Sequence, residues 1–261
     1  KHNYLITKIE DLAVTIQEAF HIARSGRPGP VLVDLPKDMM SFQTELKPAG
    51  AVKLKSYRPT YKPNVRQLGK VVELIKKAKK PLILAGGGVI LSKGAQALRE
   101  FAEAIESPVT TTLMGLGGFP TDTPKWLGMI GMHGTYRANM ASGNCDLMIA
   151  VGVRFDDRVT GKIDAFAQNA KIVHVDIDPT SIRKNIPVAI PVVGDCKQTL
   201  EMLNELIKEQ AEGVFNGSRG KWFVQIEEWK STKKLDYQQK DVIKPQYVVE
   251  TLHRLTKGEA I

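Results

Sequence analysis

Two arginines and two adjacent carboxylates stand close together in GVRFDDRVTGK, residues 152–162. The segment directly follows DLMIAV (146–151), an apolar run that is typical of a buried strand. An arginine at this place, Arg154 or Arg158, could bind a phosphate or carboxylate group through two parallel hydrogen bonds. We therefore expect a charged ligand to bind at the carboxyl end of this strand.

Other polar or glycine-rich segments occupy similar positions along the chain. They are AGGG (85–88), TTLMG (111–115), GMHGT (131–135), DIDP (176–179) and GD (194–195). In open α/β sheets, ligands bind beyond the carboxyl ends of the strands, and an acidic residue there, such as Asp176, can accept from ribose hydroxyls. AGGG lacks the GxGxxG spacing and is weak evidence alone. Together, the six segments predict a nucleotide site.

The elements that must position these segments alternate between strand and helix. Residues 64–80 predict a helix with Asn64 as N-cap and with Leu68, Val71, Val72 and Ile75 on one face. The predicted sequence of elements then runs through PLILAGGG (strand), AQALREFAEAIES (helix), PVTTTLMGLGG (strand), and the β-rich runs CDLMIAVG, KIVHVDID and VAIPVVGD. This alternation predicts an α/β fold with a parallel sheet and right-handed crossovers, which places helices on both faces.

The first 40 residues form a separate α/β piece in this interpretation. Thr7 and Glu10 match a capping box before apolar residues at helical spacing, which predicts a helix that ends at SGRPGP (25–30). VLVDLP (31–36) predicts a strand that is buried on both faces. Residues 41–63 hold three prolines and show no sustained periodicity, so we expect a linker there.

Composition bounds the classes of protein to which the chain can belong. The chain has 261 residues, 43% hydrophobic and 25% charged, and contains no run of about 18 apolar residues, so we expect no membrane span. Its start shows no signal peptide and no initiator Met, and we expect a fragment.

Cys145 and Cys196 form no CxxC motif, which favours a reducing, cytoplasmic location and no metal site. The net charge of +9 follows presumed helix faces without interleaved aromatics, so we expect no nucleic-acid partner.

Longer motifs, taken in order, resemble one enzyme family. They are GRPGPVLVDLPKDM, AGGGVILS, TTLMGLGGFP, LGMIGMHGTYRANMA, CDLMIAVGVRFDDRVTGKIDAFA and KIVHVDIDPTSIRKN. This set closely resembles the large catalytic subunits of acetolactate synthase, also called acetohydroxyacid synthase, over essentially the whole chain. These are thiamine-diphosphate enzymes with a pyrimidine-binding, a central FAD-binding and a diphosphate-binding domain, and the resemblance implies a Rossmann-like central fold.

The resemblance also implies domain boundaries. It divides the chain into 1–40 (end of the pyrimidine-binding domain), 41–63 (linker), 64–210 (central FAD-binding domain), 211–240 (linker) and 241–261 (truncated start of the diphosphate-binding domain). We expect the terminal run 244–261 to form a helix followed by the first residues of a strand.

Site residues follow from the matching motifs. The positions that match the family's FAD contacts are Arg27, Gly87, Thr112, Leu113, Met114, Gly115, Gly131, Met132, His133, Gly152, Val153, Arg154, Phe155, Asp156, Asp176, Ile177 and Asp195. Lys37, Asp157 and Arg158 match positions near the substrate channel, and Arg158 is our choice for the carboxylate of the incoming 2-keto acid. Each also has a plainer interpretation: Arg27 could cap a helix, and His133 could simply hold its loop together.

The catalytic parts of the family are missing from this chain. The family needs a Glu in the first domain, and a GDG motif with a downstream Asn that holds Mg²⁺ and the diphosphate. The only GD pair, Gly194-Asp195, continues with Cys196. We therefore expect no catalytic residue and no metal ligand in this chain, and no activity from it alone. The parent enzyme would condense two pyruvates, or pyruvate and 2-ketobutyrate, with release of CO2 in branched-chain amino-acid biosynthesis.

Partners and alternatives complete the expectations. The resemblance implies 2-keto acid substrates, a homo-oligomer in the full-length protein and a possible small regulatory subunit. Two other interpretations stay open: another thiamine-diphosphate enzyme, of the glyoxylate carboligase or pyruvate oxidase type, and a non-catalytic nucleotide-binding module. FDDRVTG (155–161) and the KD after DLP (34–38) favour acetolactate synthase.

Overall fold

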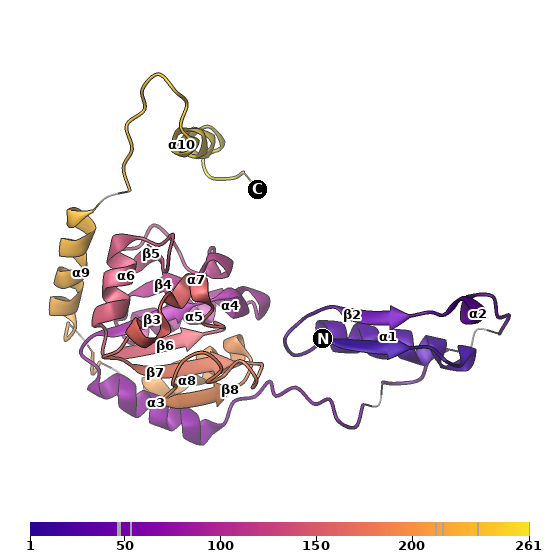
Figure 1. The fold of residues 1–261 in the computed structure, drawn as a ribbon. Coiled ribbons are helices and arrows are strands. Elements are labelled where there is room, and N and C mark those ends of the chain that lie inside the picture. Colours follow the sequence, from indigo (N-terminus) through magenta and orange to yellow (C-terminus); the bar gives the residue numbers. More distant parts are fainter. Residues whose placement is uncertain (46–47, 53, 212, 216, 234, 261) are drawn as a thin grey trace.

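The chain folds into an N-terminal unit, a central unit and a C-terminal helix, as Figure 1 shows. The structure is a computed structural model that describes residues 1–45, 48–52, 54–211, 213–215, 217–233 and 235–260. Extended segments join the three parts, and the C-terminal helix α10 (Pro245–Thr256) lies apart from the central unit at the top of Figure 1.

The N-terminal unit is small and open. Two parallel strands, β1 (His2–Leu5) and β2 (Val31–Asp34), pair in register, and α1 (Leu12–Arg24) connects them after a single 3-10 turn (Ile9–Asp11). A short helix, α2 (Lys37–Met40), follows β2. The strand β1 was not expected from the sequence.

Two expectations for this unit were wrong. The predicted capping box does not form, because the 3-10 turn precedes α1 and the N-cap of the α-helix is Asp11, whose side chain makes no capping hydrogen bond. The strand β2 is not buried on both faces, since Val31 and Val33 are half-buried while Leu32 and Asp34 are exposed. The cause of this exposure is that two strands and one long helix do not provide enough surface to cover both faces of the sheet.

The central unit is built on six strands. They are β3 (Pro81–Ala85), β4 (Val109–Thr111), β5 (Trp126–Met129), β6 (Leu147–Val151), β7 (Lys171–Asp176) and β8 (Ile190–Val193). The helices are α3 (Val65–Lys77), α4 (Gly87–Leu91), α5 (Ala95–Ala104), α6 (Tyr136–Asn144), α7 (Asp157–Thr160), α8 (Cys196–Ala211) and α9 (Gly220–Thr232), with 3-10 turns at Leu113–Gly115 and Ile163–Ala165. The predicted strands and the two predicted helices, α3 and α5, are confirmed, whereas β5 and the other helices were not predicted individually.

All six strands are parallel, in the order β5-β4-β3-β6-β7-β8. The chain adds strands in one direction from β3 to β5 and in the other from β6 to β8. The neighbours β3 and β6 therefore mark the point at which the winding reverses, where ligands bind in such sheets.

Side chains alternate between two cores, one on each face of the sheet. In β3, Ile83 and Ala85 face the core that α3, α5 and α8 cover, while Leu82 and Leu84 face the core under α6 and α9. The strands β3 and β6 are buried along their whole length. Helices on both faces of a parallel sheet confirm the predicted α/β, Rossmann-like fold class.

Side-chain hydrogen bonds satisfy both ends of α3, one from a local residue and one from a residue distant in sequence. Asn64 accepts a hydrogen bond from the Arg66 backbone N–H at 2.9 Å, as expected of an N-cap. Leu68, Val71 and Val72 are fully buried on the predicted face. At the other end, Arg219 donates to the carbonyl of Ile75 at 2.8 Å and so satisfies part of the last turn.

Part of the predicted second linker, 211–240, packs against the sheet. Residues 220–232 form α9, and the indole of Trp222 is buried and donates to the carbonyl of Pro81 at 2.9 Å. Ile226 also lies in the second core. By contrast, the described residues of 41–63 contain neither helix nor strand. The expected strand after α10 is not formed in residues 257–260, and residue 261 lies outside the described residues.

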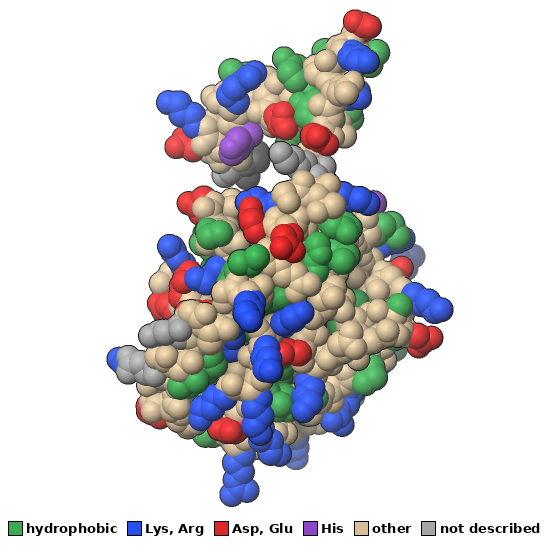
Figure 2. Space-filling model, turned by 90° about the vertical axis from the view of Figure 1, so that its left-hand side faces the viewer, with side chains coloured by type: hydrophobic (Ala, Val, Ile, Leu, Met, Phe, Trp, Pro, Cys, Tyr) green, Lys and Arg blue, Asp and Glu red, His purple; other side chains and the backbone are tan. Residues whose placement is uncertain are grey.

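Figure 2 shows the side of the molecule that carries α9. Lys and Arg side chains are spread over the lower part of this side, with fewer Asp and Glu among them. Within the described residues, no helix is long and apolar enough to cross a membrane.

Candidate functional site

The six parallel strands end at one edge of the sheet, which we call the rim. Most of the predicted cofactor residues lie there, because each follows directly on a strand. They are Gly87 after β3, Thr112–Gly115 after β4, Gly131–His133 after β5, Gly152–Asp156 after β6, Asp176 with Ile177 at the end of β7, and Asp195 after β8. The tertiary fold therefore brings together segments that are more than 100 residues apart in the sequence.

Glycines let the loops after β3 and β6 touch through their backbones. A Cβ atom on Gly86 would lie 2.2 Å from the carbonyl oxygen of Gly152, and one on Gly88 would lie 2.6 Å from its Cα. Gly152 itself has φ +64°, and its carbonyl accepts from the backbone N–H of Gly88 at 3.2 Å. The glycine run thus joins the two strands at the reversal point. Gly87, by contrast, is half-exposed, and a Cβ there would lie 3.1 Å from the Cβ and 3.4 Å from the carbonyl oxygen of Met114.

The loop after β6 alternates between buried and exposed side chains. Val153 and Phe155 are buried, whereas the side chains of Arg154 and Asp156 are about half-exposed and form an ion pair at 3.3 Å. Phe155 has φ +52°, a left-handed backbone conformation that is unfavourable for an aromatic residue. Its ring packs edge-on against His174 and Phe166. The buried rings therefore hold the loop so that its charges face outward.

The backbone of Arg158 connects this loop with the loop after β5. Its carbonyl accepts from the backbone N–H of Met132 at 3.1 Å, and a Cβ on Gly131 would lie 2.1 Å from the same carbonyl oxygen. The Arg158 side chain is 68% exposed, and its Nε lies 3.9 Å from a carboxylate oxygen of Asp157. Lys37, the third predicted channel residue, lies on α2 in the N-terminal unit, well apart from α7 in Figure 1. The structure brings Asp157 and Arg158 together but not Lys37.

Asp176 is a buried carboxylate at the end of β7. Only 6% of the residue is exposed, and burial raises its pKa to about 6, although a hydrogen bond from the Asp178 backbone N–H at 2.8 Å opposes the shift. His174 Nε2 lies 3.9 Å away, but burial lowers the pKa of that imidazole, which therefore stays neutral. No neighbouring cation among the described residues neutralises Asp176 directly, and a donor from a ligand would stabilise its charged form.

Four further predicted residues lie at the rim, and two of them form polar contacts with other protein groups. Arg27 pairs with Asp178, two residues beyond Asp176, at 3.4 Å, and so ties the N-terminal unit to the loop after β7. Asp195 accepts from the Gln198 backbone N–H at 3.0 Å, so this carboxylate caps α8. Leu113 and Met114, on the 3-10 turn after β4, are largely exposed and give the rim an apolar part.

Sequence reasoning missed two residues that support the rim. His174 Nε2 lies 2.7 Å from the carbonyl oxygen of Val153, and Asn185 donates to the carbonyls of Arg154 and Phe155. His174 stands inside an apolar alternation, and Asn185 lies in an irregular segment, so neither offered a local signal. Within the described residues, Thr111 Oγ1 at the end of β4 and His174 Nδ1 are buried without a hydrogen-bond partner.

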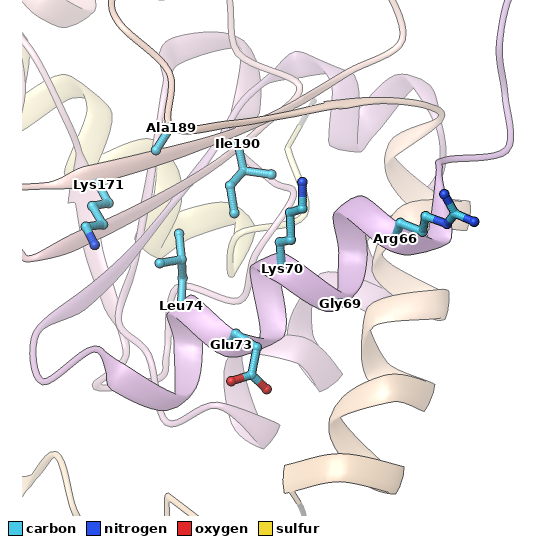
Figure 3. A pocket seen from close by; sticks show the side chains of 8 residues that line it. All are labelled: Arg66, Gly69, Lys70, Glu73, Leu74, Lys171, Ala189 and Ile190. Atoms are coloured by element: carbon cyan, nitrogen blue, oxygen red, sulfur yellow. The ribbon is translucent and has the colours of Figure 1, made fainter.

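One surface hollow lies away from the rim. It measures about 710 Å³ and is lined by Arg66, Gly69, Lys70, Glu73, Leu74, Lys171, Ala189 and Ile190. Figure 3 shows Lys70 and Leu74 of α3 pointing toward Ile190, while Glu73 points away. Lys171 and Ile190 begin their strands, so this hollow opens at the amino ends of β7 and β8. A second hollow of about 500 Å³ is lined by residues 183–188 and includes Asn185.

The thiols and carboxylates offer little other chemistry. Both cysteines are buried and free, and burial raises the pKa of the Cys145 thiol to about 12, so it stays protonated at neutral pH. Among the described residues, no group of three or more His, Cys, Asp or Glu side chains is arranged to hold a metal ion.

Comparison with known proteins finds relatives along the whole chain. The family model described as "Thiamine pyrophosphate enzyme, central domain" matches residues 68–203. The acetolactate synthase large subunit of Haemophilus influenzae is 45% identical over 264 residues, which cover 100% of this chain and 46% of the relative. The isozyme 3 large subunit of Escherichia coli is 44% identical over 263 residues, with the same coverage. The chain thus spans about half the length of these curated relatives.

A solved structure matches the fold. It is an X-ray structure of a protein from Mycobacterium smegmatis that is described as a thiamin diphosphate-dependent enzyme, with a TM-score of 0.63 and 27% sequence identity. The match covers 79% of this chain and 39% of that one. The resemblance that the motifs predicted is confirmed.

Proposed function

The chain belongs to the thiamine pyrophosphate enzyme family, and from this membership we propose that it is the central part of an acetolactate synthase large subunit. The relatives that match over the full chain carry that name at 44–46% identity. The proposed parent enzyme joins two pyruvates, or pyruvate and 2-ketobutyrate, and releases CO2. The proposed domain boundaries are those implied by the family motifs, with α9 packed on the central sheet.

We propose that the rim binds FAD, and the observation that carries this proposal is the buried Asp176. A carboxylate whose pKa is raised to about 6 by burial, beside a neutral imidazole, is poorly compensated within the protein. At the end of a parallel strand, such a group is suited to accept hydrogen bonds from ribose hydroxyls. The residues present therefore fit an adenine dinucleotide.

Other parts of the rim would hold the remaining groups of FAD. Arg154, whose side chain is 58% exposed, would bind a phosphate, and the exposed Leu113 and Met114 would contact an apolar ring. Gly87 is half-exposed and carries no side chain beside Met114, so a ligand could approach its backbone closely. The resemblance to acetolactate synthase implies that FAD would serve as a structural element rather than in a net redox step, so the proposed task of these residues is binding and orientation.

Arg158 is the proposed contact for the carboxylate of the 2-keto acid. Its guanidinium is mostly exposed, and its nearest carboxylate, that of Asp157, lies at 3.9 Å, too far for a direct hydrogen bond. The backbone of Arg158 is fixed by Met132, so the side chain projects from a firm base. Lys37 would join this channel only in the assembled protein.

Thiamine diphosphate and Mg²⁺ would bind outside this chain. The sole GD pair does not resemble a diphosphate site, because Asp195 caps α8 and Cys196 is buried. We therefore propose that the chain alone has no turnover, and that a homo-oligomer of full-length subunits provides it. The names of the relatives also support a small regulatory subunit as partner.

Thermal shift measurements test the proposed cofactor. We expect FAD to raise the melting temperature of the purified chain more than NAD or ADP does, because a ligand that binds only the native state stabilises it. Arg154→Gln should reduce the shift, whereas Lys70→Gln, in the hollow at the opposite end of the sheet, should not. Equal shifts with NAD and ADP would favour a general nucleotide-binding module instead.

A turnover assay tests the second part of the proposal. The chain, incubated with pyruvate, thiamine diphosphate and Mg²⁺, should form no acetolactate. Acetolactate formation by this chain would contradict the assignment of the thiamine site to other parts of the enzyme.

A further inference from the structure

We propose that Asn185 is a positioning residue of the rim: its side-chain amide fixes the backbone from which Arg154 projects toward the nucleotide phosphate. The inference rests on the proposed FAD site. It concerns a residue outside the set predicted from the sequence.

The contact joins two neighbouring loops of the rim. Asn185 lies in the segment after β7, and its Nδ2 donates to the carbonyl of Phe155 at 2.7 Å and to that of Arg154 at 3.2 Å. An amide nitrogen carries two hydrogens, so one side chain can satisfy both carbonyls. A single residue thereby holds two successive peptide groups of the loop after β6.

These peptide groups need such support. Phe155 adopts φ +52°, a conformation that non-glycine residues avoid, and it persists only where surrounding contacts determine it. The buried ring of Phe155 holds one side, against His174 at 5.0 Å between ring centres. Asn185 holds the other side through the carbonyls. Without its donor, the backbone of residues 154 and 155 is free to return to a more favourable conformation.

The direction of Arg154 depends on this backbone. Among the described residues, its guanidinium has one ion-pair partner, Asp156 at 3.3 Å, and the side chain is more than half exposed. Contacts to the side chain alone therefore do not determine where it points. His174, 2.7 Å from the carbonyl oxygen of Val153, anchors the loop one residue earlier. Arg154 thus stands between two fixed points, of which Asn185 is the second.

A double-mutant cycle on FAD affinity tests the inference. Asn185→Asp keeps the shape of the side chain but replaces the donor with an acceptor, and Arg154→Gln removes the guanidinium. Calorimetric titration of the purified chain with FAD should show about tenfold weaker binding for each single variant. If Asn185 acts through Arg154, the double variant should bind no more weakly than Arg154→Gln alone. The neighbouring, exposed Lys184→Gln should bind as the unmodified chain does.

Each outcome has a definite meaning. Unchanged FAD affinity in Asn185→Asp, or losses that multiply in the double variant, would overturn the inference. If the unmodified chain binds no FAD, the proposed function fails rather than the role of Asn185. Should Asn185→Asp fail to fold, as judged by circular dichroism, Asn185→Ala serves in the same cycle, because it deletes the donor without adding a charge.

Discussion

The two sheets of this protein are both parallel, yet they are covered very differently. In the central unit, β3 and β6 are buried along their whole length between two layers of helices. In the N-terminal unit, Leu5 and Leu32 are largely exposed on the strands, and Phe20 is 70% exposed on α1. Parallel sheets are stable when both faces are covered. The central sheet meets this requirement within the chain, whereas the N-terminal sheet does not.

This difference in coverage indicates that the central unit provides the stability on which the rim depends. The central unit has enough buried apolar surface to hold its rim rigid, including a strained residue at 155 and a poorly compensated carboxylate at 176. The N-terminal unit reaches the rim through Arg27, whose contact with Asp178 is long and partly exposed. Such contacts contribute little to stability. We expect the two units to respond separately to mutation.

The largest expected effect comes from the glycines at the reversal point. Gly86→Ala would place a Cβ 2.2 Å from a backbone oxygen of the loop after β6, so the central unit must distort. We expect a loss of about 4 kcal/mol or more in the free energy of unfolding. Gly69→Ala on α3 is the control, since its Cβ meets nothing within 4 Å, and it should stabilise by about 0.5 to 1 kcal/mol. Urea denaturation followed by tryptophan fluorescence measures both; equal stability of the two variants would refute the close packing of the rim.

Matched core truncations compare the two units directly. Leu98→Ala in α5 removes a fully buried side chain and should cost about 2 to 5 kcal/mol. Ile22→Ala in α1 should cost less, because its surroundings are half-open. All three tryptophans lie at 126, 222 and 229, so fluorescence follows the central unit and its helix α9. We expect the fluorescence transition to shift in the first variant only. A similar shift in both would show that the units unfold together.

The raised pKa of Asp176 predicts a pH dependence of stability in the central unit. Its pKa is near the ordinary 3.8 in the unfolded chain and about 6 in the folded one, so the folded state keeps a proton that the unfolded state loses. Stability should therefore fall as pH rises from about 4 to 6, by on the order of 2 to 3 kcal/mol, and stay lower above this range. Asp176→Asn keeps an acceptor for the Asp178 N–H and removes the fall.

The measurement is the difference in unfolding free energy between Asp176→Asn and the unmodified chain, taken from pH 4 to pH 8. It should be small at pH 4 and favour the variant at pH 8. FAD affinity should decrease in the same variant. A difference that does not change with pH would contradict the raised pKa.

The smallest expected effect concerns the two long helices nearest the linker. Asn64→Ala removes the capping bond to the Arg66 N–H and should cost about 1 kcal/mol. Asp11→Ala at the start of α1 should cost less than about 0.5 kcal/mol, because the Asp11 side chain makes no capping bond. Thermal unfolding followed by circular dichroism separates the two. A larger effect at position 11 would mean that the α1 cap forms in solution.

Much of the central fold could be predicted because its signals are local. Apolar runs such as 81–85 and 147–151 indicate strands that are buried on both faces, and Asn64 precedes a clear helical period. The signals failed where burial depends on partners distant in sequence. The run 31–33 is as apolar as the others, yet Leu32 is exposed, and Trp222 is buried although its helix lies in a predicted linker.

The sequence by itself determined the family and the parallel α/β class. It also determined that the charged segments directly follow strands. Periodicity and short motifs suffice for this, since strand ends are defined by residues close together in the chain. The tertiary structure alone decided which segments meet: that Gly86 touches Gly152, that Asn185 holds the carbonyls of 154 and 155, and that Lys37 stays apart from Arg158. These contacts depend on strand order and on backbone geometry, which no local pattern of residue types records.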